Sequence, residues 1–215
     1  MTVTAIVPAR AGSKGIPGKA PSVDRVIVST DSGEIAAVAK EHGAEVPFLR
    51  PPELALDETP GLLPVLHALD WMEEHEGRPP EWTLVLQATS PLRTAGDIEA
   101  AVSLAREKKA RAVVSVTPAA HHPYLLKTVG PSGRLEDFLP GKHRVAGRQE
   151  LPPVHSLNGA IYLARTDFLQ EKKTFYSEDT YAYVMPAERS LDVDTPWDLH
   201  LLRLIMKAGT IDESR

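Results

Sequence analysis

The chain has 215 residues and contains no cysteine. This absence excludes a disulfide framework, a thiolate metal site and a cysteine nucleophile, because each of them needs a thiol. A chain without thiols suits a reducing compartment, and we therefore expect the protein to be cytoplasmic.

Long apolar runs are absent as well. No window approaches the ~20 apolar residues of a membrane span, and residues 1–10 lack the basic start and apolar stretch of a signal peptide. The sequence therefore predicts a soluble protein with no membrane partner.

An excess of positive charge is also lacking. The chain has 24 Lys and Arg against 29 Asp and Glu, a net charge of −5, and the cations are spread along the sequence. Nucleic-acid binders usually carry a basic patch or stripe. We therefore exclude a nucleic-acid partner and expect any anionic ligand to be held by a local site.

Short apolar runs alternate with segments of helical spacing. This alternation, in a chain that is 42% apolar, predicts a single α/β domain over residues 1–215 with a doubly wound, mostly parallel sheet. Residues 117–156 break the pattern with many Pro, Gly, His and basic residues, which indicates an inserted lobe. The expected strands cover residues 2–8, 25–29, 83–87, 157–164, 181–185 and 191–193. The expected helices cover residues 34–41, 62–74, 97–108 and a terminal stretch from Thr195.

Two of these helices have capping signals at their start. Asp31 precedes Glu34 by three residues and Thr94 precedes Asp97 by three, the spacing of a capping box.

The first crossover is too short for this fold. Parallel strands normally need a connection of a dozen or more residues, usually with a helix. Residues 9–23 contain three glycines and two prolines and show no apolar periodicity. The sequence thus predicts that the first helix is missing.

A glycine-rich segment, residues 9–19, follows the first expected strand. Ligands of open α/β sheets bind beyond the carboxyl ends of the strands, so this segment is well placed to hold phosphate groups. Its glycines allow backbone N–H groups to approach phosphate oxygens, and its other side chains supply positive charge and a hydroxyl. The residues in question are Arg10, Gly12, Ser13, Lys14, Gly15, Gly18 and Lys19. The alternative is an ordinary glycine-rich turn with solvated basic residues.

Asp192 and Asp194 end an apolar run, and side chains two apart on a strand point to the same side. Two converging carboxylates suit Mg²⁺, which prefers one or two carboxylates together with water and phosphate oxygens. Alternatively, Asp194 or Thr195 only caps the last helix, with Asp198 as the capping-box acid. A cap has no need of Asp192, which favours the metal hypothesis.

Gln87 follows an apolar strand and so emerges at the same sheet edge. Its amide can both donate to and accept from a sugar hydroxyl or a carboxylate, although a polar turn into a helix is a competing interpretation. Arg148 is able to bind a carboxylate in a bidentate manner, but such basic residues usually form a solvated face. Phe175 and Tyr176 are more often local packing residues than a substrate platform.

Six motifs together resemble the acylneuraminate cytidylyltransferases, also called CMP-sialic acid synthetases. In order, they are PARAGSKGIPGK (8–19), VIVSTD (26–31), FLRPPELA (48–55), LQATSPLR (86–93), RQELPP with NGAIY (148–162) and LDVDT (191–195). The resemblance implies a nucleotide-diphospho-sugar transferase-like sheet. It also implies a reaction in which the anomeric hydroxyl of a nine-carbon 2-keto sugar acid attacks the α-phosphate of CTP and releases pyrophosphate.

The resemblance also implies roles for individual residues. Asp192 and Asp194 match the Mg²⁺ pair, where Mn²⁺ is an alternative ion. The residues implied for CTP are Arg10, Ser13, Lys14, Lys19 and Arg50. Those implied for the sugar acid are Gln87, Lys127, Arg148, Phe175 and Tyr176. The implied catalytic set is Lys19, Gln87, Asp192 and Asp194.

The resemblance further implies a homodimer. The inserted lobe would exchange between subunits and carry Lys127 and Arg148 to the partner's site.

The chain departs from this family at three places. About twenty residues are lacking between Lys19 and Asp24, which agrees with the short crossover. Ala20 stands where the family usually has Asn, and Ser156 stands where some relatives have a basic residue. Pseudaminate, legionaminate and Kdn are therefore open as substrates besides N-acetylneuraminate. A catalytically silent nucleotide- or sugar-acid-binding homologue, and an enzyme for another base or sugar, are the alternative functions.

Overall fold

A computed structural model of the chain describes residues 1–9, 20–139 and 151–209. Its main feature is a six-stranded sheet with the strand order β2-β1-β3-β7-β4-β8. These strands are β1 (Val3–Pro8), β2 (Arg25–Ser29), β3 (Trp82–Val85), β4 (Ala112–Pro118), β7 (His155–Arg165) and β8 (Thr180–Val184).

The predicted α/β sheet with mostly parallel strands is confirmed. β1 pairs in parallel with both β2 and β3, and β4 pairs in parallel with β8. β7 is antiparallel to both of its neighbours, β3 and β4. The sheet therefore consists of two parallel blocks joined by one antiparallel strand.

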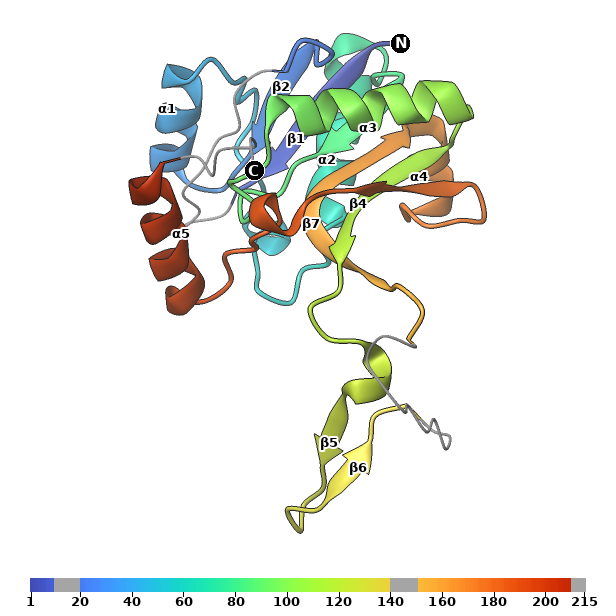
Figure 1. Cartoon of the computed structure of the whole chain (residues 1–215). Coiled ribbons are helices and arrows are strands. Elements are labelled where there is room, and N and C mark those ends of the chain that lie inside the picture. Colours follow the sequence, from blue (N-terminus) through green and yellow to red (C-terminus); the bar gives the residue numbers. More distant parts are fainter. Residues whose placement is uncertain (10–19, 140–150, 210–215) are drawn as a thin grey trace.

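Helices cover both faces of the sheet, as Figure 1 shows. They are α1 (Gly33–Glu41), α2 (Leu63–Glu76), α3 (Ala95–Lys108), α4 (Thr166–Lys172) and α5 (Pro196–Ala208). α1 and α3 contribute to the core on one face, and α2 and α4 contribute to the core on the other. The arrangement is the doubly wound one that the sequence predicts.

Strand β1 shows why the sequence forms a buried strand here. Ala5 and Val7 belong to the core on the α3 side, whereas Ile6 belongs to the core on the α2 side. Successive side chains of a strand point to opposite faces, so a strand between two layers of helices must be apolar at every position.

The predicted helix caps are confirmed for α3 and wrong for α1. Thr94 and Asp97 form the predicted capping box of α3. The predicted cap of α1 is wrong by one residue: Ser32, not Asp31, is the N-cap, and its Oγ accepts from the N–H of Ile35. Both residue types can cap a helix, and Ser32 is the one with extended backbone directly before the first turn.

The predicted strand at residues 191–193 is also wrong. These residues belong to no strand, and the N–H of Val193 donates to the carbonyl of Thr89 at 2.8 Å. The segment runs along the turn after β3 and does not pair with a strand of the sheet.

The short crossover from β1 to β2 can be examined at its two ends. At the carboxyl edge of the sheet, the N–H of Ala9 donates to the carbonyl of Ser29 at 3.0 Å. At the opposite edge, Val3 and Asp24 exchange two hydrogen bonds of 2.9 and 2.7 Å. The described residues between β1 and β2 contain no helix, and residues 10–19 lie outside the described part.

The predicted lobe contains a hairpin that projects from the sheet (Figure 1). The chain leaves β4, passes a 3₁₀ turn (Pro123–Leu125) and forms the pair β5 (Lys127–Val129) and β6 (Leu135–Asp137). We call residues 119–139 the arm. Large apolar side chains are exposed on it, among them Val129 (69%) and Leu135 (73%).

The packing generates a first prediction. Replacing Leu163 of β7, which is fully buried, by Ala should lower the free energy of unfolding by about 2–5 kcal/mol, because it removes apolar contacts and leaves a cavity. Urea denaturation measures this change. Leu204 of α5 is half exposed, and its replacement by Ala should change the free energy by less than about 0.5 kcal/mol. Equal losses for the two variants would contradict the described core.

Candidate active site

A cavity of about 340 Å³ lies beyond the carboxyl ends of β1 and β3. Its wall combines the end of β1, the turn after β3 and the segment after β2. The polar lining includes Arg50, Asp57, Gln87, Thr89 and Asp194. This is the sheet edge where open α/β folds bind their ligands.

An irregular stretch of β7 forms the floor beside this cavity. β7 and β4 are in register at Tyr162 and again at Leu157, but the single residue Ser115 lies opposite residues 158–161. The Ser115 hydroxyl donates to Asn158 Oδ1 at 2.6 Å and so stabilises the extra residues. Irregularities of this kind bend a strand and redirect its side chains, and they are frequent next to active sites.

Gln87 and Asp192 converge over Gly159 in this stretch. Gly159 has a φ of 71°, and a methyl group on it would lie 2.6 Å from Gln87 Oε1 and 3.3 Å from Asp192 Oδ2. Ser90 Oγ would also be 3.3 Å away. Only a residue without a Cβ therefore allows these polar groups to approach the backbone so closely.

Asp192 is the electrostatically unusual member of the site. Its Oδ1 is buried and has no hydrogen-bond partner among the described residues. Burial raises the pKa of the Asp192 carboxyl, and the nearby charge of Asp194 raises it further. Hydrogen bonds from the Thr89 hydroxyl and the Val193 N–H act in the opposite direction. A buried carboxylate oxygen with no donor is a natural ligand for a cation.

Asp194 is exposed and lines the cavity. Of the two predicted caps of the last helix, Thr195 with Asp198 as the capping-box acid is confirmed, and Asp194 is not the cap. Its carboxylate is therefore not required by the cap. The described residues contain no group of three or more His, Asp or Glu placed to hold a metal ion. The two aspartates fit Mg²⁺ as a site that phosphate oxygens and water would complete.

Arg50 lines the cavity but is itself buried, with 5% of its surface exposed. Its guanidinium donates to the Oγ of Ser29 at 3.1 Å, to the carbonyl of Ser29, and to the carbonyl of Leu54 at 3.5 Å. These bonds attach the segment after α1 to the end of β2. The predicted contact of Arg50 with a nucleotide stays a prediction.

The predicted aromatic pair adjoins Tyr162, a tyrosine that the sequence did not indicate. The rings of Phe175 and Tyr162 are 5.3 Å apart. Burial raises the pKa of Tyr162 to about 12, with contributions from Tyr176 and Asp192. Tyr162 ends the motif NGAIY, and the structure places it opposite Val85 of β3, two residues before Gln87.

Several predicted residues are not brought to this site within the chain. Lys127 lies on the arm and forms an exposed ion pair with Asp137. The remaining predicted residues, Arg10, Gly12, Ser13, Lys14, Lys19 and Arg148, lie outside the described residues.

A mostly parallel sheet with a polar cavity at its carboxyl edge is the arrangement of α/β proteins that bind a ligand beyond their strand ends. Two solved structures share the fold. One is described as a CMP:2-keto-3-deoxy-manno-octonic acid synthetase complexed with CTP, with a TM-score of 0.65, 17% identity, and coverage of 97% of this chain and 99% of that chain. The other is 4-diphosphocytidyl-2C-methyl-D-erythritol synthase from Anaerococcus prevotii, with a TM-score of 0.62, 12% identity, and coverage of 96% and 98%.

The sequence then gives the particular family. A family model described as "Cytidylyltransferase" matches residues 19–183, which is most of the chain. The chain belongs to the cytidylyltransferase family and is a nucleotidyltransferase.

Curated relatives support this assignment. A CMP-N,N'-diacetyllegionaminic acid synthase of Legionella pneumophila is 32% identical over 232 residues, covering 96% of this chain and 97% of that protein. An N-acylneuraminate cytidylyltransferase of Streptococcus agalactiae serotype V is 33% identical and covers 92% of this chain, which spans about half (52%) of that protein. A pseudaminic acid cytidylyltransferase of Campylobacter jejuni is 23% identical, covering 95% of this chain and 96% of that protein.

The Legionella comparison also bears on the short crossover. Its alignment extends over 232 positions, more than the 215 residues of the chain, so it must contain gaps in this chain. This chain is therefore shorter than that relative over the aligned region, and the loss of residues near Lys19 stays a prediction.

None of the helices in the described ranges has the length and apolar character needed to span a bilayer.

The close approach at Gly159 generates a second prediction. Gly159→Ala should lower cytidylyltransferase turnover at least tenfold, because its methyl group would displace Gln87 and Asp192. The matched control is Gly43→Ala: Gly43 has a φ of 79° and open space around its Cα. Both variants should lose about 1–2 kcal/mol of stability through backbone strain, measured by urea denaturation. If both lost turnover equally, or neither did, the assignment of Gly159 to the site would be wrong.

Proposed function

We propose that the chain transfers CMP from CTP to the anomeric hydroxyl of a nonulosonic acid and releases pyrophosphate. The hydroxyl oxygen forms a bond to the α-phosphorus as it loses its proton, and the bond from that phosphorus to the pyrophosphate oxygen breaks. The family and the relatives that are synthases of CMP-linked sugar acids support this reaction. The observation that carries the proposal is the buried, unpaired oxygen of Asp192 beside Gln87.

Asp192 and Asp194 would hold Mg²⁺, or Mn²⁺ in its place. Such an ion supplies positive charge that stabilises the phosphate oxygens during transfer. The two carboxylates contribute differently: Asp192 is held in place by Thr89 and Val193, whereas Asp194 faces the open cavity. One ligand is thus fixed by the fold and the other is accessible to the incoming substrate.

The other residues of the site act by positioning. The Gln87 amide would hydrogen-bond a hydroxyl or the carboxylate of the sugar acid. Tyr162 is protonated at neutral pH, as an ordinary tyrosine also is, and its hydroxyl interacts with Tyr176. Phosphoryl-type transfer depends mainly on positioning and charge stabilisation, so the site needs no protein nucleophile.

The arm supports a proposal about assembly. We propose a homodimer in which the arm of one subunit covers the site of its partner and delivers Lys127 to it. The exposed Val129, Leu135 and Phe138 of the arm give it an apolar surface that a second subunit would cover.

The absence of cysteine and the requirement for CTP support a cytoplasmic location.

A second candidate function rests on the short crossover. A homologue with a shortened connection between β1 and β2 would bind a sugar acid or a nucleotide without turning it over. The short connection between β1 and β2 favours this candidate, since it contains the segment predicted to hold triphosphate.

Pyrophosphate release separates the candidates and identifies the sugar. The full chain is incubated with CTP and Mg²⁺ and with N-acetylneuraminate, a diacetyllegionaminate, a pseudaminate or Kdn in turn. We expect release with at least one of them, and none when Mg²⁺ is chelated. UTP, GTP and ATP test the choice of base. The absence of release with every sugar acid would favour the silent homologue.

The metal assignment generates a third prediction. Asp194→Asn should lower turnover by two orders of magnitude or more, because the substitution keeps the shape of the side chain and removes its charge. Stability should change by less than about 0.5 kcal/mol, since Asp194 is exposed and does not cap α5. Asp70→Asn on the exposed face of α2 is the control, and it should behave like the unmodified chain. Turnover of Asp194→Asn within threefold of the unmodified chain would refute the assignment.

A further inference from the structure

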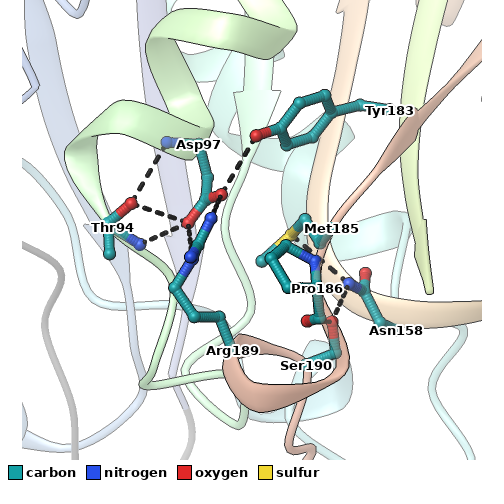
Figure 2. A network of polar contacts seen from close by, with 8 residues as sticks. All are labelled: Thr94, Asp97, Asn158, Tyr183, Met185, Pro186, Arg189 and Ser190. Carbon is teal, nitrogen blue, oxygen red and sulfur yellow. Dashed lines mark hydrogen bonds and ion pairs between the residues drawn. The ribbon is translucent and has the colours of Figure 1, made fainter. Parts of the chain in front are cut away.

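One carboxylate outside the cavity has more partners than its local role requires. Asp97, on α3, is 1% exposed and completes the capping box with Thr94. Its two oxygens also accept from Arg189 Nε at 3.0 Å, from a terminal nitrogen of Arg189 at 2.9 Å and from the Tyr183 hydroxyl at 3.0 Å (Figure 2). A capping box needs none of these three bonds.

The bond to Arg189 fixes the chain just before the acidic pair. Arg189 ends a 3₁₀ turn, Ala187–Arg189, three residues before Asp192. Ser190 is held from the other side, because Asn158 Nδ2 donates to its Oγ at 3.0 Å and this Oγ donates to the carbonyl of Pro186 at 2.7 Å. Figure 2 shows the turn between Asp97 on one side and Asn158 on the other. The segment with Asp192 therefore starts from a clamped position.

A second arginine extends the same charge cluster to Gln87. Arg93 is 9% exposed, and its two terminal nitrogens each lie 3.4 Å from the carbonyl of Gln87. It also donates to the carbonyl of Ala160, next to Gly159. Burial lowers the pKa of Arg93 to about 10, and the negative charge of Asp97 opposes this lowering. Asp97 also accepts from the N–H of Thr94 at 2.9 Å. Thr94 directly follows Arg93, so Asp97 holds the backbone beside the residue that binds the Gln87 turn.

We propose that Asp97 is a positioning residue that fixes both halves of the site, the acidic segment through Arg189 and the Gln87 turn through Arg93. Asp97 lies on α3 and does not line the cavity, so it acts through other residues. The expected effect of Asp97 on turnover rests on the proposed function. Its expected effect on the order of the two segments does not.

A positioning role and a purely structural role of Asp97 predict local opening in different parts of the molecule. Buried ion pairs are weak evidence for stability by themselves, because desolvation offsets their attraction. If Asp97 only stabilised the fold, its loss would affect all segments to a similar degree. If it positions the site, residues 186–194 and 86–93 would loosen before the rest of the sheet.

The experiment compares Asp97→Asn with a control, Asp167→Asn, whose ion pair with Arg165 is exposed. Asp167 also lies in the first turn of a helix. Its carboxylate accepts from Nε of Arg165 at 3.1 Å and from a terminal nitrogen of Arg165 at 2.8 Å. That pair sits at the opposite edge of the sheet, where Arg165 is paired with Trp82 at the start of β3. Asparagine keeps the size and one acceptor oxygen at each position and removes the charge.

Hydrogen exchange of the full chain, followed by mass spectrometry without ligand, is the first measurement. Asp97→Asn should accelerate exchange about tenfold or more in residues 186–194, including the Val193 amide, and in residues 86–93. Asp167→Asn should leave both segments unchanged. Arg189→Lys keeps the charge but loses the two-pronged bond, and should give an intermediate effect. It also serves as the test if Asp97→Asn fails to fold.

Metal and substrate dependence provide the second measurement. In the presence of CTP, Mn²⁺ affinity measured by electron paramagnetic resonance should fall about tenfold in Asp97→Asn, as for other groups that orient metal ligands. The Mg²⁺ concentration for half-maximal pyrophosphate release should rise by a similar factor.

The outcomes separate the two proposals. Unchanged exchange in residues 186–194 and 86–93, or a uniform increase over the whole chain, would overturn the positioning role even in an active enzyme. Localised loosening in a protein that releases no pyrophosphate with any sugar acid would retain the positioning role and remove the proposed function.

Discussion

The pairing of β7 with both of its neighbours is the interaction on which the rest of the structure depends. β1, β2 and β3 form one parallel block, β4 and β8 form another, and β7 hydrogen-bonds to the inner edge of each. The same strand carries Asn158, Gly159 and Tyr162, and its first residues adjoin the arm. The sheet, the floor of the site and the arm therefore share one strand, and none of them can be placed without it.

Local signals in the sequence were sufficient for much of this fold. The β1 run and the capping box at Thr94 and Asp97 were predicted correctly because the residues that determine them are neighbours in the chain. The antiparallel direction of β7 depends on partners about eighty residues away and leaves no local mark. The strand predicted at residues 191–193 failed for a related reason, since apolar alternation also occurs where a chain covers a turn.

The site shows the same division between local and distant information. The sequence indicated Gln87, Asp192 and Asp194, and the structure places the first two against Gly159 and the third in the wall of the cavity. It did not indicate Tyr162, which lies in regular register with Val85 of β3 and Val114 of β4, just after the irregular stretch of β7. A buried carboxylate oxygen without a donor costs stability, and proteins retain such groups where they serve a function. Oδ1 of Asp192 fits that description, whereas both oxygens of Asp97 accept hydrogen bonds.

The central position of β7 also determines the order in which the protein can be assembled. Thr83 at β3 and Thr166 just after β7 share a buried hydrogen bond although 83 residues separate them. During synthesis, a chain that ends before residue 155 contains β3 with one unpaired edge and β4 without either of its partners, β7 and β8. Such edges readily pair with other chains, and contacts between distant residues form slowly. The nascent protein is thus most exposed to aggregation while the arm is being made, and β7 and then β8 cover the two edges of β4.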